Sequence, residues 1–144
     1  MIATADASFL VSLYGGDVNT PAARAWMAAN VTPLLLSDAL RFETENALRL
    51  AHFRGKLALA ELHNALTEIE SDLATGILIA RDIPAAAHWV ECRRLSAVHT
   101  LILGCTAYDI THVAGSLVMG ADTFLTFDQK QRSLAMQAGL LVGP

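Results

Sequence analysis

The chain has 144 residues, of which 53% are hydrophobic and 17% charged. This length and composition predict one folded domain spanning residues 1–144 and exclude a disordered or purely solvating chain. Ten Lys and Arg against fourteen Asp and Glu give a formal net charge of −4, which argues against a broad basic surface for sequence-independent nucleic-acid binding.

No apolar run reaches the roughly 18 residues that suggest a membrane span. The first residues, Met1–Asp6, lack the basic start of a signal peptide. Cys92 and Cys105 are too few for a disulfide scaffold and are not spaced as a redox pair, so we expect two small core residues. We therefore expect a soluble, cytoplasmic protein with no membrane partner.

Short apolar runs alternate with longer segments of helical period along the whole chain. The predicted strands are 2–5, 33–36, 77–80, 123–127 and 140–142. The predicted helices are 7–14, 20–30, 38–54, 57–74, 84–99, 107–119 and 129–138. Strands separated by whole helices predict parallel crossovers. The expected fold class is α/β, a three-layer α/β/α domain with a central, mainly parallel five-stranded sheet.

Acidic residues gather at one expected edge of this sheet. Asp6 follows the first strand and Asp128 the fourth, and Glu43 and Asp109 lie near the starts of helices that reach the same edge. Two unit charges about 4 Å apart repel by roughly 4 kcal/mol at an effective dielectric of 20, so such a cluster needs a cation. Oxygen ligands without a Cys or His cluster predict Mg²⁺ or Mn²⁺ rather than zinc. Asp122, before the fourth strand, is expected to be a turn residue.

Three of these acids also have a local explanation. Asp6 and Asp128 each precede a predicted helix and are candidate N-caps. Thr106 and Asp109 have the spacing of a capping box. The residue pattern alone therefore leaves two roles open for each of them, a helix cap or a metal ligand.

Glu43 falls on the mostly apolar side of the helix 38–54, where a carboxylate needs a partner, either a metal ion or an arginine. Asn46, one turn on, is a candidate donor to that carboxylate. Asp109, His112 and Ser116 form a narrow polar strip at positions i, i+3 and i+7. His112 is either a structural histidine or a supporting residue of the site.

Four short motifs occur in order along nearly the whole chain. They are Asp6-Ala7-Ser8, Phe42-Glu43-Thr44-Glu45-Asn46-Ala47-Leu48, Asp109-Ile110-Thr111-His112-Val113-Ala114 and Thr126-Phe127-Asp128. This set resembles the PIN-domain ribonucleases, and within them the VapC-type toxins of type II toxin–antitoxin systems. The resemblance implies that the catalytic, metal-binding acids are Asp6, Glu43, Asp109 and Asp128. It also implies that Thr126 hydrogen-bonds a ligand or orders a metal-bound water.

The resemblance further implies hydrolysis of RNA phosphodiester bonds with Mg²⁺ or Mn²⁺, which would activate water and neutralise charge on the phosphate. The implied partners are the RNA substrate, a cognate antitoxin and a second copy in a homodimer. Relatives often carry Arg shortly before the third acid, where this chain has Thr106-Ala107. The candidate cations for RNA are Arg41, Arg49, Arg54, Lys56, Lys130 and Arg132, and for each one taken singly a solvated helix face is the stronger alternative. The candidate liners of an antitoxin groove are Leu10, Leu13, Tyr14, Trp26, Leu57 and Leu62, and most of them fit the hydrophobic core equally well.

The main alternative is a non-catalytic PIN-like module that binds RNA or protein. Other α/β families fit poorly. A haloacid-dehalogenase-type phosphatase needs a second Asp where this chain has Ser8, and Gly15-Gly16 does not supply the GxGxxG of a dinucleotide-binding domain. A receiver domain needs an acidic pair near the N-terminus, which is also missing.

Overall fold

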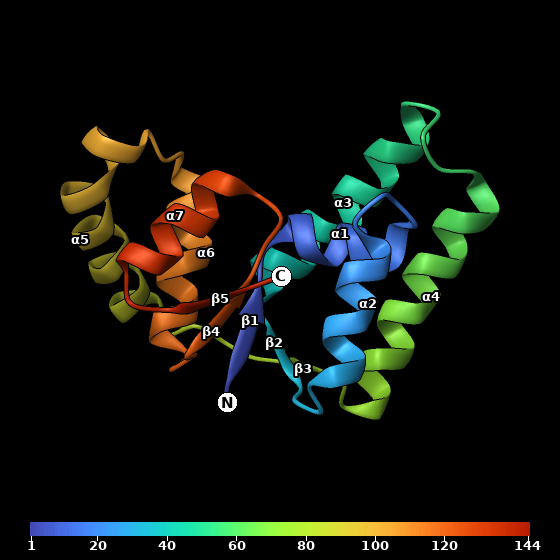
Figure 1. The fold of residues 1–144 in the computed structure, drawn as a ribbon, viewed down its shortest axis with the longest axis horizontal. Coiled ribbons are helices and arrows are strands. Elements are labelled where there is room, and N and C mark those ends of the chain that lie inside the picture. Colours follow the sequence, from blue (N-terminus) through green and yellow to red (C-terminus); the bar gives the residue numbers. More distant parts are fainter.

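The computed structural model describes residues 1–144 and forms a parallel five-stranded sheet with helices on both faces (Figure 1). The strands are β1 (Ala3–Ala5), β2 (Leu34–Leu36), β3 (Leu78–Ala80), β4 (Thr123–Leu125) and β5 (Leu141–Gly143). The helices are α1 (Ala7–Gly15), α2 (Thr20–Ala29), α3 (Asp38–Phe53), α4 (Leu59–Thr75), α5 (Ala85–Leu103), α6 (Ala107–Val118) and α7 (Gln129–Gln137). The strand order is β3-β2-β1-β4-β5, and every neighbouring pair is parallel.

Two hydrophobic cores cover the two faces of the sheet and confirm the predicted three-layer α/β/α fold. The first packs α1–α4 against the sheet around Phe9, Leu34 and Leu48. The second packs α5–α7 against it around Leu95 and Phe124. Figure 1 shows the two groups of helices on opposite sides of the sheet.

The structure corrects the expected antitoxin groove. Of its six candidate liners, five are buried in the first core and one packs against it from the surface. The buried five are Leu10, Leu13, Tyr14, Leu57 and Leu62, and the partly buried one is Trp26. These side chains face the sheet and their own helices, so they do not line an open groove. The two cysteines, Cys92 and Cys105, are free and buried as expected.

Helix α5 differs most from its predicted bounds, because it continues to Leu103 rather than ending at residue 99. It stops at Gly104, whose φ of 63° is the left-handed conformation that favours glycine at a helix end. The added turn carries Leu101 and Ile102, which are 96% and 75% exposed. No helix combines the length and the apolar composition that crossing a bilayer requires.

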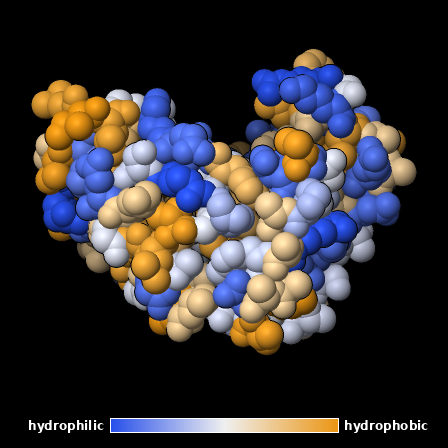
Figure 2. Space-filling view, viewed as in Figure 1, coloured by the Kyte–Doolittle hydropathy of each residue, from blue (hydrophilic) through white to orange (hydrophobic).

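All strands run in one direction, so their carboxyl ends lie at one edge of the sheet, and α1, α3, α6 and α7 begin near it. Each of these helices is capped by a side chain that accepts a backbone N–H: Asp6, Ser37, Thr106 and Asp128 respectively. Figure 2 shows that the surface above this edge is hollowed between two raised ends. In the same view, α3 and α4 form one end, and α5, α6 and α7 form the other.

Candidate active site

Asp6 is the centre of the hydrogen-bond network at the carboxyl edge, and it is fully buried. Its carboxylate accepts hydrogen bonds from the Ser8 hydroxyl at 2.6 Å, from the backbone N–H of Phe9 at 3.0 Å and from the Thr126 hydroxyl. Burial raises the pKa of Asp6, while these three donors act to lower it. The result is a carboxylate held in one orientation and destabilised in its charged form.

The sheet brings Thr126 to Asp6 although 120 residues separate them. Ala5 and Leu125 are partners in the β1–β4 register, so the residues that follow them lie side by side. The backbone N–H of Asp6 donates to the Leu125 carbonyl at 3.0 Å and continues this pairing by one residue. Neighbouring parallel strands thus fix the distance between the acid and its hydroxyl donor.

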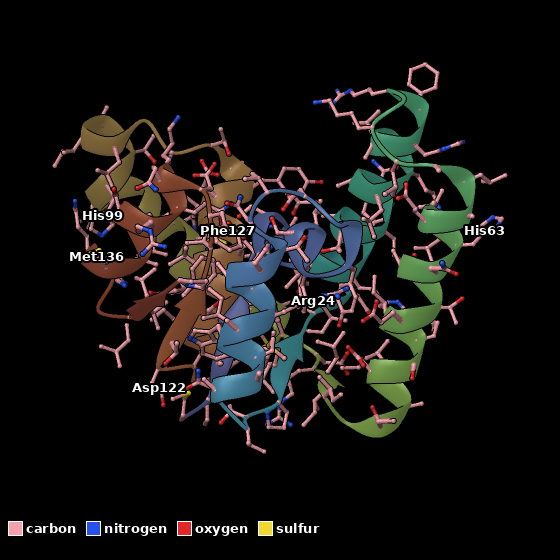
Figure 3. The ribbon with its side chains drawn as sticks, turned by 45° about the vertical axis from the view of Figure 1, so that its right-hand side comes forward. Arg24, His63, His99, Asp122, Phe127 and Met136 are labelled. Atoms are coloured by element: carbon pink, nitrogen blue, oxygen red, sulfur yellow. The ribbon has the colours of Figure 1, made fainter.

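Ser8 is a site residue that the sequence analysis did not single out. Its hydroxyl donates to Asp6, lies 3.4 Å from the Thr126 hydroxyl and accepts the backbone N–H of Phe127 at 2.9 Å. The Phe127 ring lies in the middle of the molecule (Figure 3) and stacks on Phe9, with ring centroids 5.9 Å apart. The available sequence signal was the Asp-x-Ser spacing, since a serine two residues after an aspartate can turn back to its carboxylate.

The partner of Glu43 is a histidine of α6, His112, and not the arginine or the Asn46 amide that the sequence suggested. The Nε2 atom of His112 forms a hydrogen bond with the Glu43 carboxylate. The His112 side chain is 3% exposed and that of Glu43 is 33% exposed. A positive charge on His112 would also act to lower the pKa of Asp6, the residue that follows β1. His112 therefore contacts Glu43 and affects Asp6 only through its charge, while Asn46 is exposed.

Hydrogen bonds that start at Thr4 of β1 fix the position of the His112 backbone. The Thr4 hydroxyl donates to the Ser116 hydroxyl at 2.7 Å, and Ser116 donates to the His112 carbonyl at 2.8 Å. All three residues are buried. Ser116, the last member of the predicted polar strip, thus anchors α6 to the sheet.

Asp109 and Asp128 both bind backbone amides. The Asp109 carboxylate accepts the N–H of Thr106 at 2.7 Å, and the Thr106 hydroxyl accepts the N–H of Asp109 at 3.3 Å, a reciprocal capping box. The Asp128 carboxylate is exposed and accepts the N–H groups of Lys130 and Gln131 at 2.8 and 2.9 Å. The capping roles left open by the sequence are therefore present in the structure.

Asp122 lies away from these residues, at the opposite end of β4 (Figure 3). Its carboxylate accepts the backbone N–H of Ile2 at 3.0 Å and the Thr123 hydroxyl at 2.7 Å, and these bonds lower its pKa. It is a turn residue, as expected.

The donor set at the carboxyl edge is of the type that hard divalent cations prefer, since it consists of carboxylate oxygens. As the side chains stand, however, no group of three or more His, Cys, Asp and Glu residues is arranged to hold a metal ion. Glu43 is paired with His112, and Asp109 is turned into its capping box. The residues fit a divalent cation in chemical type, and Glu43 and Asp109 each keep one carboxylate oxygen outside their present hydrogen bonds.

The six candidate cations separate into engaged and free groups. Arg132 donates to the Thr126 and Pro144 carbonyls, and Arg41 pairs with Glu45 and Glu70. Arg49 approaches Glu45 only at 3.5 Å. The free group is exposed and forms no ion pair: Arg54, Lys56 and Lys130.

The PIN domain family matches residues 3–136, which include all four acids and every strand except β5. The chain belongs to the PIN domain family. The resemblance seen in the sequence motifs is thereby confirmed, and the three-layer fold is the architecture of this PIN domain.

Two solved structures share the fold of this PIN domain. VapC20 of Mycobacterium tuberculosis, described as a sarcin–ricin loop cleaving toxin, has a TM-score of 0.69 and 18% identity, with 99% of each chain covered. FitAcB from Neisseria gonorrhoeae has a TM-score of 0.63 and 19% identity, with 99% of this chain and 97% of that chain covered. A search of the curated proteins found no match.

Proposed function

We propose that this PIN domain is a metal-dependent endoribonuclease, the toxin of a toxin–antitoxin pair, that hydrolyses RNA phosphodiester bonds. The observation that carries the proposal is the buried Asp6 carboxylate at the carboxyl end of β1, held by Ser8 and Thr126, with the Glu43–His112 pair of α3 and α6 at the same edge of the sheet. A buried acid with a raised pKa, placed beyond the strand ends of an open parallel sheet, is typical of a functional site. The shared fold with a toxin described as cleaving the sarcin–ricin loop supports the same reading.

Asp6, Glu43, Asp109 and Asp128 are the residues that would hold Mg²⁺ or Mn²⁺, which when bound lowers the pKa of water and neutralises charge on the phosphate. Ser8, Thr126 and Phe9 already fix the orientation of the Asp6 carboxylate. His112 keeps Glu43 directed toward α6 and the site.

The helix starts around the site favour an anionic substrate. Helices α1, α3, α6 and α7 begin near the carboxyl edge, and the amino end of a helix carries a partial positive charge of roughly half a unit. Asp6, Asp109 and Asp128 already accept backbone N–H groups at three of these helix starts. With a divalent cation offsetting these acids, the helix starts would add to the attraction for phosphate despite the net charge of −4.

The test is cleavage of total cellular RNA and of synthetic RNA by the purified chain freed of antitoxin, with Mg²⁺ or Mn²⁺. We expect Asp6→Asn and Glu43→Gln each to lower the rate by at least about 100-fold, the scale for losing one group that stabilises developing charge. EDTA should abolish cleavage. The matched control is Asp122→Asn, which removes a carboxylate at the opposite end of β4 and should cleave at the wild-type rate.

Cleavage at the wild-type rate by Asp6→Asn, or in EDTA, would contradict the proposal. Sequencing the 5′ ends of RNA cut during brief expression would name the substrate and the cut site. Growth arrest on expression, relieved by co-expressing a short reading frame encoded immediately upstream, would support the antitoxin partner. Sedimentation of the purified chain tests the proposed homodimer.

A non-catalytic PIN-like module that binds RNA or protein is the second candidate. The observation that favours it is that Asp6, Asp109 and Asp128 each cap a helix end, so their presence does not by itself require chemistry. The same cleavage assay distinguishes the two candidate functions. A non-catalytic module would bind the RNA and leave it intact at every metal concentration.

A further inference from the structure

Two of the five phenylalanines are exposed, and both lie on α3. Phe42 is 64% exposed and Phe53 is 85% exposed. Leu50, between them, is 38% exposed. Residues 42, 46, 50 and 53 are three or four positions apart and therefore share one side of the helix. Two solvated aromatic rings about 16 Å apart along the helix axis thus flank a half-exposed leucine.

The bond from Glu43 to His112 fixes the direction in which this side of α3 faces. Glu43 points across the site toward α6. Leu50 and Asn46 lie within about 60° of Glu43 around the helix, and Phe42 and Phe53 lie about 80–100° from it on the same flank, so this exposed flank adjoins the side that faces α6. In Figure 1, α3 is the inner helix of its raised end and α4 the outer one, and Figure 2 shows the hollow beside them. The exposed side of α3 is therefore a wall of the hollow that starts at the candidate active site.

Cations accompany the aromatic rings. Four of the ten Lys and Arg residues fall within residues 41–56: Arg41, Arg49, Arg54 and Lys56. Arg54 and Lys56 form no ion pair, whereas Arg49, 52% exposed, pairs with Glu45 at 3.5 Å. Exposed aromatic rings beside unpaired cations are the combination that binds single-stranded nucleic acid, because the rings stack on bases and the cations contact phosphates.

We propose that the α3 wall, defined as Phe42, Arg49, Leu50, Phe53, Arg54 and Lys56, binds single-stranded RNA next to the site, with Phe42 and Phe53 stacking on unpaired bases. The inference rests on the proposed function, since a strand held along this wall leads to Glu43. It adds to that function a set of residues that hold the substrate and lie outside the acidic site. The polyanionic charge of RNA complements Arg49, Arg54 and Lys56, whereas an apolar protein segment has no need of them.

The experiment measures binding without cleavage. The full chain carrying Asp6→Asn is titrated against a fluorescein-labelled, 12-nucleotide single-stranded RNA of random sequence, and fluorescence anisotropy gives the Kd. Adding Phe53→Ala should raise the Kd by at least about fivefold, the lower end of the stacking contribution per base. Adding Arg54→Gln should lower the slope of log affinity against log salt by about 0.7. Phe42→Ala is the second stacking variant.

Matched controls lie on α5, in the other raised end. Leu101→Ala removes an apolar side chain that is 96% exposed, and Arg93→Gln removes an exposed cation. Neither should change the Kd or the salt slope. With Asp6 intact, Phe53→Ala should raise KM for RNA cleavage and leave kcat unchanged, because the ring contacts bases away from the acids.

The outcomes separate this inference from the proposed function. RNA binding that weakens in Phe53→Ala supports the inference even if the wild-type chain cleaves nothing, a result that would overturn the nuclease instead. An unchanged Kd in both Phe53→Ala and Phe42→Ala overturns the inference while cleavage by wild type stands. An unchanged Kd together with a lower sedimentation coefficient in Phe53→Ala also overturns it and assigns the wall to self-association.

Discussion

The hydrogen bond from Thr126 to Asp6 can be tested through stability alone. Replacing Thr126 with valine keeps the side chain nearly the same size and removes the hydroxyl that donates to the buried carboxylate. A hydrogen bond to a charged group contributes about 1.5–3 kcal/mol. Urea unfolding of Thr126→Val at pH 7 should therefore show a free energy of unfolding lower by that amount.

The pH dependence has a definite sign. Burial already raises the native pKa of Asp6 above its ordinary value, and losing the Thr126 donor raises it further. The loss of stability is greatest above this raised native pKa, where the carboxylate is ionised. It shrinks as the pH falls through that pKa, because the protonated carboxyl depends less on the donor. In the Asp6→Asn background the substitution should have a much smaller effect at pH 7.

The matched control is Thr44→Val. Thr44 is also buried, at 2% exposure, but its hydroxyl has no hydrogen-bond partner. Removing an unpaired buried hydroxyl should leave stability unchanged or raise it by about 1 kcal/mol. The reasoning is refuted if Thr44→Val destabilises as much as Thr126→Val, or if the effect of Thr126→Val is the same with aspartate or asparagine at position 6.

Two further predictions concern packing and ionisation away from the acids. The Tyr14 hydroxyl donates to Asp72 at 2.6 Å, and burial together with Asp72 raises the pKa of Tyr14. Above about pH 10 the tyrosine ionises in the unfolded state before it does in the folded state, so the free energy of unfolding of wild type should fall. Urea unfolding should show that Tyr14→Phe loses less stability over the same pH range. A Cβ at Gly115 would lie 2.7 Å from the Ile83 side chain. Because that contact is to the terminal Cδ1 of Ile83, a flexible and partly exposed end that can move aside, and because Gly115 lies inside α6, Gly115→Ala should leave stability unchanged or raise it by up to about 1 kcal/mol in urea unfolding. A destabilisation of more than about 1 kcal/mol, relieved in an Ile83→Val background, would contradict this expectation.

The sequence predicted those features of the fold that depend on local pattern. The strand that ends before Asp6 and the helix that begins after it follow from an apolar run and a capping residue, and the same holds at Asp128. Thr106, which follows α5, likewise signalled the start of α6. These short-range signals gave every strand and helix within a few residues of its observed bounds, apart from the last turn of α5.

The contacts between elements could not be predicted in this way. The partner of Glu43 depends on how α3 and α6 meet, and the sequence favoured an arginine or a metal over His112. The bond from Thr126 to Asp6 requires β4 to lie beside β1, which the order of strands along the chain does not specify. The same limit explains Arg132, whose guanidinium is engaged by carbonyls near the end of the chain rather than left free for RNA.

The helix caps at the carboxyl edge bear on how inactive homologues would be recognised. A descendant that stopped cutting RNA would still lose stability, about 0.5–2 kcal/mol for each cap, on replacing Asp6 or Asp128 with alanine. Selection for folding alone would thus preserve these aspartates. Glu43 lies in the interior of α3 and begins no helix, and a glutamine there would keep a hydrogen bond to His112 while losing the charge. Glutamine at position 43 is therefore the more informative sign that catalysis has been abandoned.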